Sequence, residues 1–169
     1  MQTLPDGAIL RRAEPADVPG IFARIVELAV YEREPDAVTS TPELLHASLF
    51  GENPNVFAHV VEVPGEDGTP EVAAIAIWFL NYSTWTGRNG LYLEDLIVSE
   101  AHRGRGYGIA LMKALARECV AHGYTRFEWT VLDWNEPSIR FYRAIGAKGQ
   151  DEWTVQRVDG AALAELAAD

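Results

Sequence analysis

Cysteine is almost missing from this chain of 169 residues, because Cys119 is the single one. One cysteine excludes a disulfide within the chain. Cys119 lies in an apolar stretch, so we interpret it as a packing residue, with a catalytic thiol as the alternative. No apolar run approaches the ~20 residues that cross a bilayer, and the first residues, MQTLPDGAILRR, lack the apolar centre of a signal peptide. We therefore expect a cytoplasmic protein with no membrane partner.

Positive charge is also scarce, with 14 Lys and Arg against 25 Asp and Glu and a formal net charge of −11. This excess of negative charge repels phosphates, so we expect no nucleic acid partner. It is compatible with a cationic small molecule, although many acidic proteins bind none. Hydrophobic residues make up 48% of the chain and are spread evenly, without repeats or linkers. The sequence therefore predicts one folded domain over residues 1–169.

The most informative stretch runs from Leu91 to Gly123 and reads LYLEDLIVSEAHRGRGYGIALMKALARECVAHG. Residues 91–98 are apolar and β-branched enough to predict a buried strand, and 107–122 predict an apolar helix that ends at Gly123. Between them lies RGRGYG. Glycines let the backbone approach an anion closely, and a helix N-terminus presents unpaired N–H groups to it. The order of strand, glycine-rich loop and helix predicts a phosphate-binding site, with a tight solvent turn as the alternative.

Two familiar glycine-rich motifs do not fit this loop. It lacks the Gly-Lys-Ser/Thr ending of a nucleotide triphosphate P-loop. The dinucleotide-binding fingerprint spaces its glycines differently and needs an acidic ribose-binding residue in a parallel βαβ unit, for which the sequence offers no counterpart. What remains is Arg-x-x-Gly-x-Gly after an acidic strand.

Periodicity and capping residues divide the chain into alternating strands and helices. Acidic residues at 14 and 17 and the cap-proline pair at 41–42 mark two early helix starts, and Asn135 with Pro137 marks a later one. The expected strands are 8–12, 56–63, 71–82, 91–98, 126–132, 148–151 and 152–158. The expected helices are 14–31, 40–50, 107–122, 135–144 and a last one from residue 161.

The loop resembles the pyrophosphate loop of the GCN5-related N-acetyltransferases (GNAT), which bind acetyl-coenzyme A, and the order of elements is that of the family. The resemblance extends from about Ile9 to Leu166 and is closest to the diamine (spermidine/spermine) and thialysine N-acetyltransferase branch. Four segments carry it: Leu28-Ala29-x-Tyr31-Glu32, Trp85, Leu91-Tyr92-Leu93-Glu94-Asp95, and Trp134-Asn135-Glu136-Pro137-Ser138-Ile139-x-Phe141-Tyr142.

This resemblance implies the fold and the coenzyme site. The fold is an α/β domain whose mixed, mostly antiparallel sheet is splayed between its fourth and fifth strands, with helices on both faces. Acetyl-coenzyme A is the implied co-substrate, with no metal. Its pantetheine arm would lie in the splayed gap, with the backbone N–H of Leu96 on the thioester carbonyl. The implied coenzyme-binding residues are Leu96, Ile97, Val98, Arg103, Gly104, Arg105, Gly106, Tyr107, Gly108, Asn135 and Tyr142.

Acetyl transfer to an amine needs a group that accepts the amine's proton and one that protonates the departing thiolate. Glu94 is the candidate base, because a carboxylate in an otherwise apolar strand is costly to bury unless it has a function or a charged partner. Pairing with an arginine is the alternative. Asp95 points to the opposite face if the strand is regular, although a bulge would bring both nearer the site. Tyr142 is the candidate acid, and a core position beside Phe141 is the alternative. Asn135 is a helix cap that also suits a hydrogen bond to the coenzyme.

The acceptor amine is implied by the same resemblance. Carboxylates of Glu32, Glu94 and Asp95 would hold an ammonium, and Tyr31, Trp85 and Trp134 would form an aromatic wall; packing is the competing role for each aromatic residue. Family members usually carry Asp where this chain has Ser83, and Arg33 adds a positive charge beside Glu32. Both departures weaken the case for long polyamines and leave room for a smaller amine or for an amino acid whose carboxylate meets Arg33 or Arg88.

We therefore expect an N-acetyltransferase acting on a primary amine of a small, polyamine- or diamine-like molecule. Acetylation of thialysine or another amino-acid side chain is one alternative, and a non-catalytic coenzyme A-binding protein is another. Relatives in the family are commonly homodimers, so we expect a homodimer, to which Trp153, Val155 and Val158 near the C-terminus would contribute unless they fill the core of one chain.

Overall fold

The computed structural model describes residues 1–65 and 67–168. They form two compact units, the N-terminal unit Met1–Thr130 and the C-terminal unit Val131–Asp169. The strands are β1 (Gln2–Thr3), β2 (Ile9–Arg12), β3 (Val56–Pro64), β4 (Pro70–Ser83), β5 (Arg88–Val98) and β6 (Phe127–Glu128). The helices are α1 (Val18–Tyr31), α2 (Pro42–Phe50), α3 (Tyr107–His122), α4 (Glu136–Ala144) and α5 (Gly160–Leu166), with short 3-10 turns η1 (Pro15–Asp17), η2 (Pro35–Ala37) and η3 (Glu100–His102).

The N-terminal unit is built on one six-stranded sheet in the order β1-β2-β3-β4-β5-β6. Every neighbouring pair is antiparallel except β5 and β6, which are parallel. In β4 all six residues from 73 to 78 are buried, which is the pattern of a strand covered on both faces. The mixed, mostly antiparallel sheet predicted from the sequence is confirmed.

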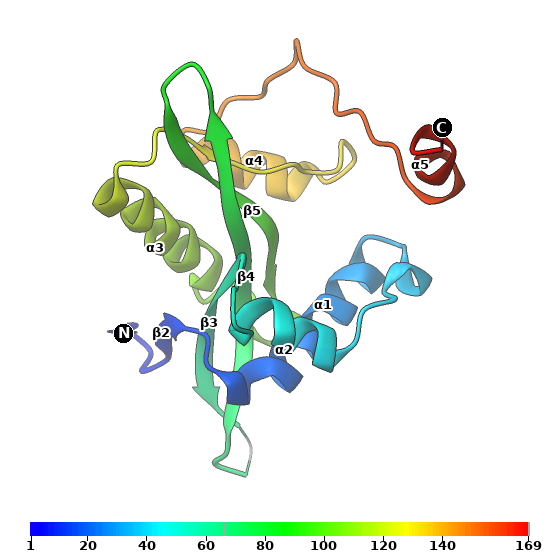
Figure 1. The fold of residues 1–169 in the computed structure, drawn as a ribbon. Helices are drawn as coiled ribbons and strands as arrows, with labels where there is room; N and C mark the ends of the chain where they lie inside the picture. Colours follow the sequence, from blue (N-terminus) through cyan, green and yellow to red (C-terminus); the bar gives the residue numbers. More distant parts are fainter. Residues whose placement is uncertain (66, 169) are drawn as a thin grey trace. The chain divides into compact units, whose positions relative to one another are not determined.

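Helices cover both faces of this sheet (Figure 1). On one face Ile21 of α1 and Leu49 of α2 pack in a cluster with Val60, Ile75 and Ile97 of the strands. On the other face lies α3, whose inner residues are buried. Burial of such a side chain contributes about 1.5–3 kcal/mol, so these two apolar layers hold the helices on the sheet.

Several helix ends match their sequence signals. Thr41 caps α2 by accepting a hydrogen bond from the backbone N–H of Leu44 at 3.3 Å. The helix α3 ends at Gly123, whose φ of 66° is the left-handed conformation that suits glycine. A different residue ends α1: Arg33 has a φ of 69°, although a side chain with a Cβ disfavours that region.

Two expectations about strands were wrong. The predicted strand 126–132 is reduced to the two residues of β6, and 148–151 and 152–158 form no strand in the part of the chain that the structure describes. The alternation of apolar residues in these segments suits a strand, but a strand also needs a hydrogen-bonded neighbour, which periodicity does not reveal. The C-terminal unit instead consists of α4, α5 and an extended connection whose Trp153 and Val155 are exposed.

Candidate active site

The glycine-rich loop between η3 and α3 has the backbone that anion binding needs. Gly104 and Gly106 have φ of 79° and 84°, so both adopt the left-handed conformation. A Cβ built on Gly104 meets nothing within 4 Å, which leaves its backbone open to an approaching group. Gly106 is the N-cap of α3 and has no side chain to accept the first N–H groups of the helix. These N–H groups and the helix dipole fit the diphosphate of a coenzyme.

Buried contacts fix the start of α3. The Tyr107 side chain is 1% exposed, and its hydroxyl donates to Oδ2 of Asp6 at 2.6 Å. The ring of His102 stacks on Tyr107, and Nδ1 of His102 lies 2.7 Å from Oγ of Ser99. The hydrogen bond from Tyr107 lowers the pKa of Asp6, and burial raises the pKa of Tyr107. The side chain of Tyr107 therefore anchors the loop, and its role in binding a coenzyme stays a prediction.

The two arginines of the loop lie differently. Nε of Arg103 donates to the carbonyl of Val98 at 3.4 Å, and its guanidinium lies 5.3 Å from the centre of the Tyr31 ring. The positive charge of Arg105 helps to lower the pKa of Asp6 and partly offsets the rise in the pKa of Tyr107 that burial causes. Arg103 thus links the glycine-rich loop to the end of α1.

The edge of β5 that faces β6 is paired over a short length. Leu91 pairs with Phe127 and Tyr92 with Glu128, and within the described chain no further residue of β5 pairs on this side. On its other side β5 pairs with β4 from Arg88 to Val98. The backbone that includes Leu96 and Val98 therefore has one free edge, where an extended molecule can add like another strand. The side chain of Ile97, by contrast, is buried in the core.

A β-bulge lies at the two candidate carboxylates. Ile77 of β4 pairs with Asp95 whereas Trp78 pairs with Leu93, so Glu94 is the extra residue on β5. Glu94 is exposed, and Asp95 is partly buried. Burial raises the pKa of Asp95 to about 6, and the negative charges of Glu94 and Glu32 add to the effect. The bulge breaks the regular alternation that would place the two carboxylates on opposite faces.

Residues at the end of α1 complete an acidic cluster that consists of Glu32, Glu94 and Asp95. Tyr31 is the last residue of α1, and Glu32 is its C-cap. Burial raises the pKa of Glu32. Because Glu32 and Glu94 both act on Asp95, the three carboxylates lie close enough to interact. Such a cluster attracts an ammonium group, and Tyr31, the residue before Glu32, has an aromatic ring of the kind that makes cation–π contacts.

Trp85 does not join this cluster within the N-terminal unit. It lies in the turn between β4 and β5 and is 91% exposed. Ser83 at the turn is five positions along β4 from Trp78 at the bulge, which is about 17 Å of strand. The role of Trp85 as an aromatic wall stays a prediction.

The remaining candidates belong to the C-terminal unit. Oδ1 of Asn135 accepts from the N–H of Ser138 at 3.3 Å, so Asn135 caps α4 as predicted. The rings of Phe141 and Tyr142 are 5.3 Å apart on that helix, and both residues are partly buried. Trp134 is 43% exposed.

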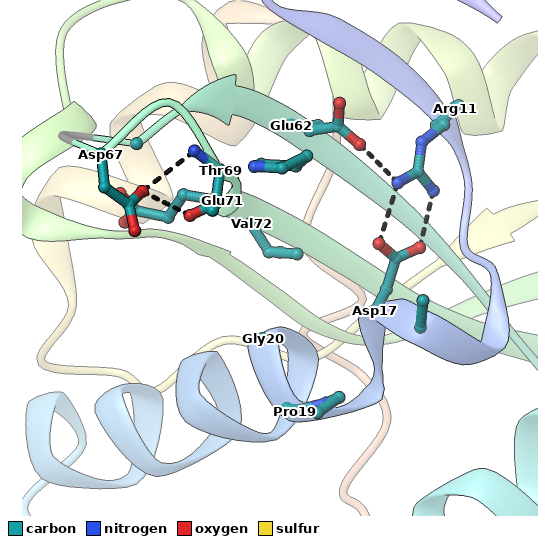
Figure 2. Close-up of a pocket in the computed structure, with 12 residues that line it drawn as sticks. Arg11, Asp17, Pro19, Gly20, Glu62, Asp67, Thr69, Glu71 and Val72 are labelled. Atoms are coloured by element: carbon teal, nitrogen blue, oxygen red, sulfur yellow. Dashed lines mark hydrogen bonds and ion pairs between the residues drawn. The ribbon is translucent and has the colours of Figure 1, made fainter.

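A pocket that sequence reasoning missed lies beside the β3–β4 connection (Figure 2). Arg11 donates there to Asp17 and to Glu62, both at 2.6 Å. Burial of this arginine between two carboxylates ties β2 and β3 to the start of α1. The pocket shares no residue with the predicted site, and the pairing of Arg11 with both carboxylates indicates a structural role.

The described residues contain no group of three histidine, cysteine or acidic side chains arranged to hold a metal ion. Nor does any helix among them have the length and apolar character needed to cross a membrane.

Comparisons with known proteins agree with this geometry. The profile of the Acetyltransferase (GNAT) family matches residues 23–147. A thialysine N-epsilon-acetyltransferase of Sus scrofa is 38% identical over 165 residues, which cover 94% of this chain and 96% of the relative. An L-ornithine N5-acetyltransferase of Arabidopsis thaliana is 31% identical and covers 91% of this chain and 85% of the relative.

Solved structures share the fold. An integron cassette protein from the mobile metagenome of V. cholerae superimposes with a TM-score of 0.78 at 26% identity, over 96% of this chain and 98% of that one. An aminoglycoside acetyltransferase from a soil metagenomic sample gives a TM-score of 0.73 at 15% identity, over 92% and 97%, a likeness of fold alone. With a family profile over most of its length and relatives above 30% identity, this chain belongs to the GNAT family of acetyltransferases.

Proposed function

We propose that this N-acetyltransferase moves the acetyl group of acetyl-coenzyme A to a primary amine of a small, diamine-like molecule. The observation that carries the proposal is the acidic cluster of Glu32, Glu94 and Asp95: Glu94 and Asp95 lie on β5, the strand that leads into the glycine-rich loop, and Glu32 is the C-cap of α1. The loop from Arg103 to Gly108 fits the diphosphate, and the free edge of β5 fits the pantetheine arm. Coenzyme A supplies the activated thioester, and the residues of the chain supply orientation and proton transfer.

The proposed chemistry is direct transfer. An acceptor amine with a pKa like that of lysine is almost wholly protonated at neutral pH, so a carboxylate must first take its proton. Glu94 or Asp95 takes this proton, directly or through a water molecule. The amine nitrogen then bonds to the acetyl carbon as the carbon–sulfur bond breaks. Tyr142 gives its proton to the departing sulfur, which balances the proton taken from the amine.

Two classes of acceptor fit this site. Diamines and polyamines match the acidic cluster. An amino acid with an amine side chain matches it too, and Arg33 favours this second class because it holds a strained left-handed backbone directly after Glu32. Strain of this kind often persists where a side chain has a function, and for Arg33 the proposed function is to bind the acceptor's carboxylate. The thialysine and L-ornithine acetyltransferases among the relatives support the same class.

An acceptor screen with detection of thiol release tests the proposal. Putrescine, spermidine, L-thialysine and L-ornithine separate acceptors that carry a carboxylate from those that do not. We expect turnover with at least one of them, and a fall of about a hundredfold or more in kcat for Tyr142→Phe, with little change in the affinity for coenzyme A. Binding of acetyl-coenzyme A without turnover on any amine would favour a non-catalytic coenzyme-binding protein. Unchanged kcat in Tyr142→Phe would remove the proposed acid.

We also propose a homodimer. The C-terminal unit exposes Trp153, Val155 and Val158, with 74%, 73% and 50% of each residue accessible in one chain. A second copy would cover these apolar side chains. A monomeric mass by light scattering at micromolar concentration would contradict this proposal. That the chain forms a single domain over 1–169 and works in the cytoplasm stays a prediction from its sequence.

A further inference from the structure

Two contacts join α1 to η3 and to the glycine-rich loop that follows it. Oε1 of Glu27 accepts from the backbone N–H of Glu100 at 2.9 Å, and the ring of Tyr31 lies 5.3 Å from the guanidinium of Arg103. Glu27 and Tyr31 are four residues apart in α1, so both project from the same face of the helix. This face of α1 therefore contacts η3 and the glycine-rich loop, and the helix ends at Glu32 of the acidic cluster.

In this arrangement the positive charge of Arg103 lies against an aromatic ring. Its Nε donates to the carbonyl of Val98 at 3.4 Å, which holds the side chain across the end of β5 and against Tyr31. A diphosphate is a stronger partner for a guanidinium, because its hydrogen bonds are charge-assisted and match the planar fork of the side chain. A bound coenzyme therefore competes with Tyr31 for Arg103.

Tyr31 has its own second partner. The family resemblance predicts that the acceptor's ammonium lies beside Glu32, with the ring of Tyr31 in cation–π contact with it. The guanidinium of Arg103 is already a cation on that ring. Two cations competing for one aromatic ring weaken each other's binding.

We propose that Arg103 occupies the ring of Tyr31 until the diphosphate of the coenzyme draws it into the glycine-rich loop, so that coenzyme binding opens the acceptor site. This inference rests on the proposed function and on the prediction that Tyr31 contacts the acceptor amine. It assigns Arg103 a positioning role beyond its charge, and it makes the binding of coenzyme and of amine mutually supportive.

Calorimetric titration with coenzyme A alone tests the exchange without any acceptor. Tyr31→Leu removes the competing ring, so we expect coenzyme A to bind about two- to fivefold more tightly than in the wild type. Tyr31→Phe keeps the ring and should bind as the wild type does. Arg103→Ala should weaken binding, and in that background Tyr31→Leu should have no effect. A Tyr31→Leu variant that folds like Tyr31→Phe by circular dichroism and binds coenzyme A no more tightly would overturn the inference.

A second titration uses L-thialysine with and without saturating coenzyme A. We expect coenzyme A to tighten thialysine binding about two- to fivefold in the wild type and in Arg105→Ala, and to have no effect in Arg103→Ala. Equal tightening in Arg103→Ala and the wild type would refute the exchange. This second titration still tests the proposal if the Tyr31→Leu variant does not fold. Absence of thialysine binding beside the expected coenzyme A results would refute thialysine as acceptor and leave the exchange intact.

Discussion

The bulge in β5 makes two neighbouring carboxylates chemically different. Glu94, the base predicted from the sequence, is exposed, whereas burial and two nearby acids raise the pKa of Asp95 to about 6. The sequence placed an acidic pair here but carries no glycine or proline that marks a bulge, so it did not reveal which carboxylate is buried. A group that must be ionised gives activity that is lost as the pH falls through its pKa.

We therefore predict that kcat/KM of the wild type falls below a pH of about 6 and that Asp95→Asn removes this acid limb. The same substitution should lower kcat/KM at neutral pH about a hundredfold, the usual contribution of a general base. Glu94→Gln is the matched control and should keep the limb. The measurement is the pH–rate profile of each variant. A limb that vanishes in Glu94→Gln and persists in Asp95→Asn would instead assign the base to Glu94.

At the scale of secondary structure, local signals decided what the sequence predicted well. The ends of α2, α3 and α4 follow from Thr41, Gly123 and Asn135, because caps act through neighbouring backbone groups. The strands after α3 were predicted poorly. Pairing with a distant strand decides whether 129–132 or 148–158 becomes a strand, and the sequence of the segment itself does not contain that information.

The two side-chain caps provide a matched pair of substitutions. Asn135 caps the helix that carries Tyr142, and Thr41 caps a helix that carries no proposed site residue. Each change to alanine removes one capping hydrogen bond and should cost about 1 kcal/mol of stability. We predict that Asn135→Ala also lowers kcat, because it loosens the first turn of α4, the helix that carries Tyr142. Thr41→Ala should leave kcat unchanged. Thermal unfolding and steady-state kinetics on both variants measure this, and equal kcat values would refute a positioning role for the cap.

At the scale of the whole molecule, two shifted groups on the N-terminal unit act on stability with opposite sign. His59 is 5% exposed, and burial, assisted by positive charge at Arg12, the N-terminus and Arg117, lowers its pKa to about 4. Its Nδ1 accepts from Nε1 of Trp78 at 3.2 Å, which needs the neutral ring. Between a pH of about 4 and 6.5 the unfolded chain binds the His59 proton and the folded chain does not, so stability from this group is lost as the pH falls.

Asp95 does the reverse. Its pKa is about 6 in the folded protein and 3.8 in the unfolded chain, so across that interval the folded state binds the extra proton and stability falls as the pH rises. The shifted pKa of each group changes the free energy of unfolding by up to about 3 kcal/mol across its pH interval. The two changes have opposite sign and nearly cancel in the wild type. We predict that the His59→Asn variant, whose amide oxygen can still accept from Trp78, is less stable at pH 6 than at pH 4. The wild type should show little difference between these two pH values.

Asp95→Asn should show the opposite slope, with stability that rises by about 3 kcal/mol from pH 4 to 6.5, because the His59 contribution is then unopposed. Urea unfolding of the three proteins at half-unit intervals of pH measures these slopes. Parallel curves for the wild type and both variants would mean that neither group keeps its shifted pKa in solution. An Asp95 whose pKa is not raised cannot set an acid limb of kcat/KM near pH 6, so a limb found there would come from another group and persist in Asp95→Asn. The stability curves and the pH–rate profile therefore test one buried carboxylate by two independent measurements.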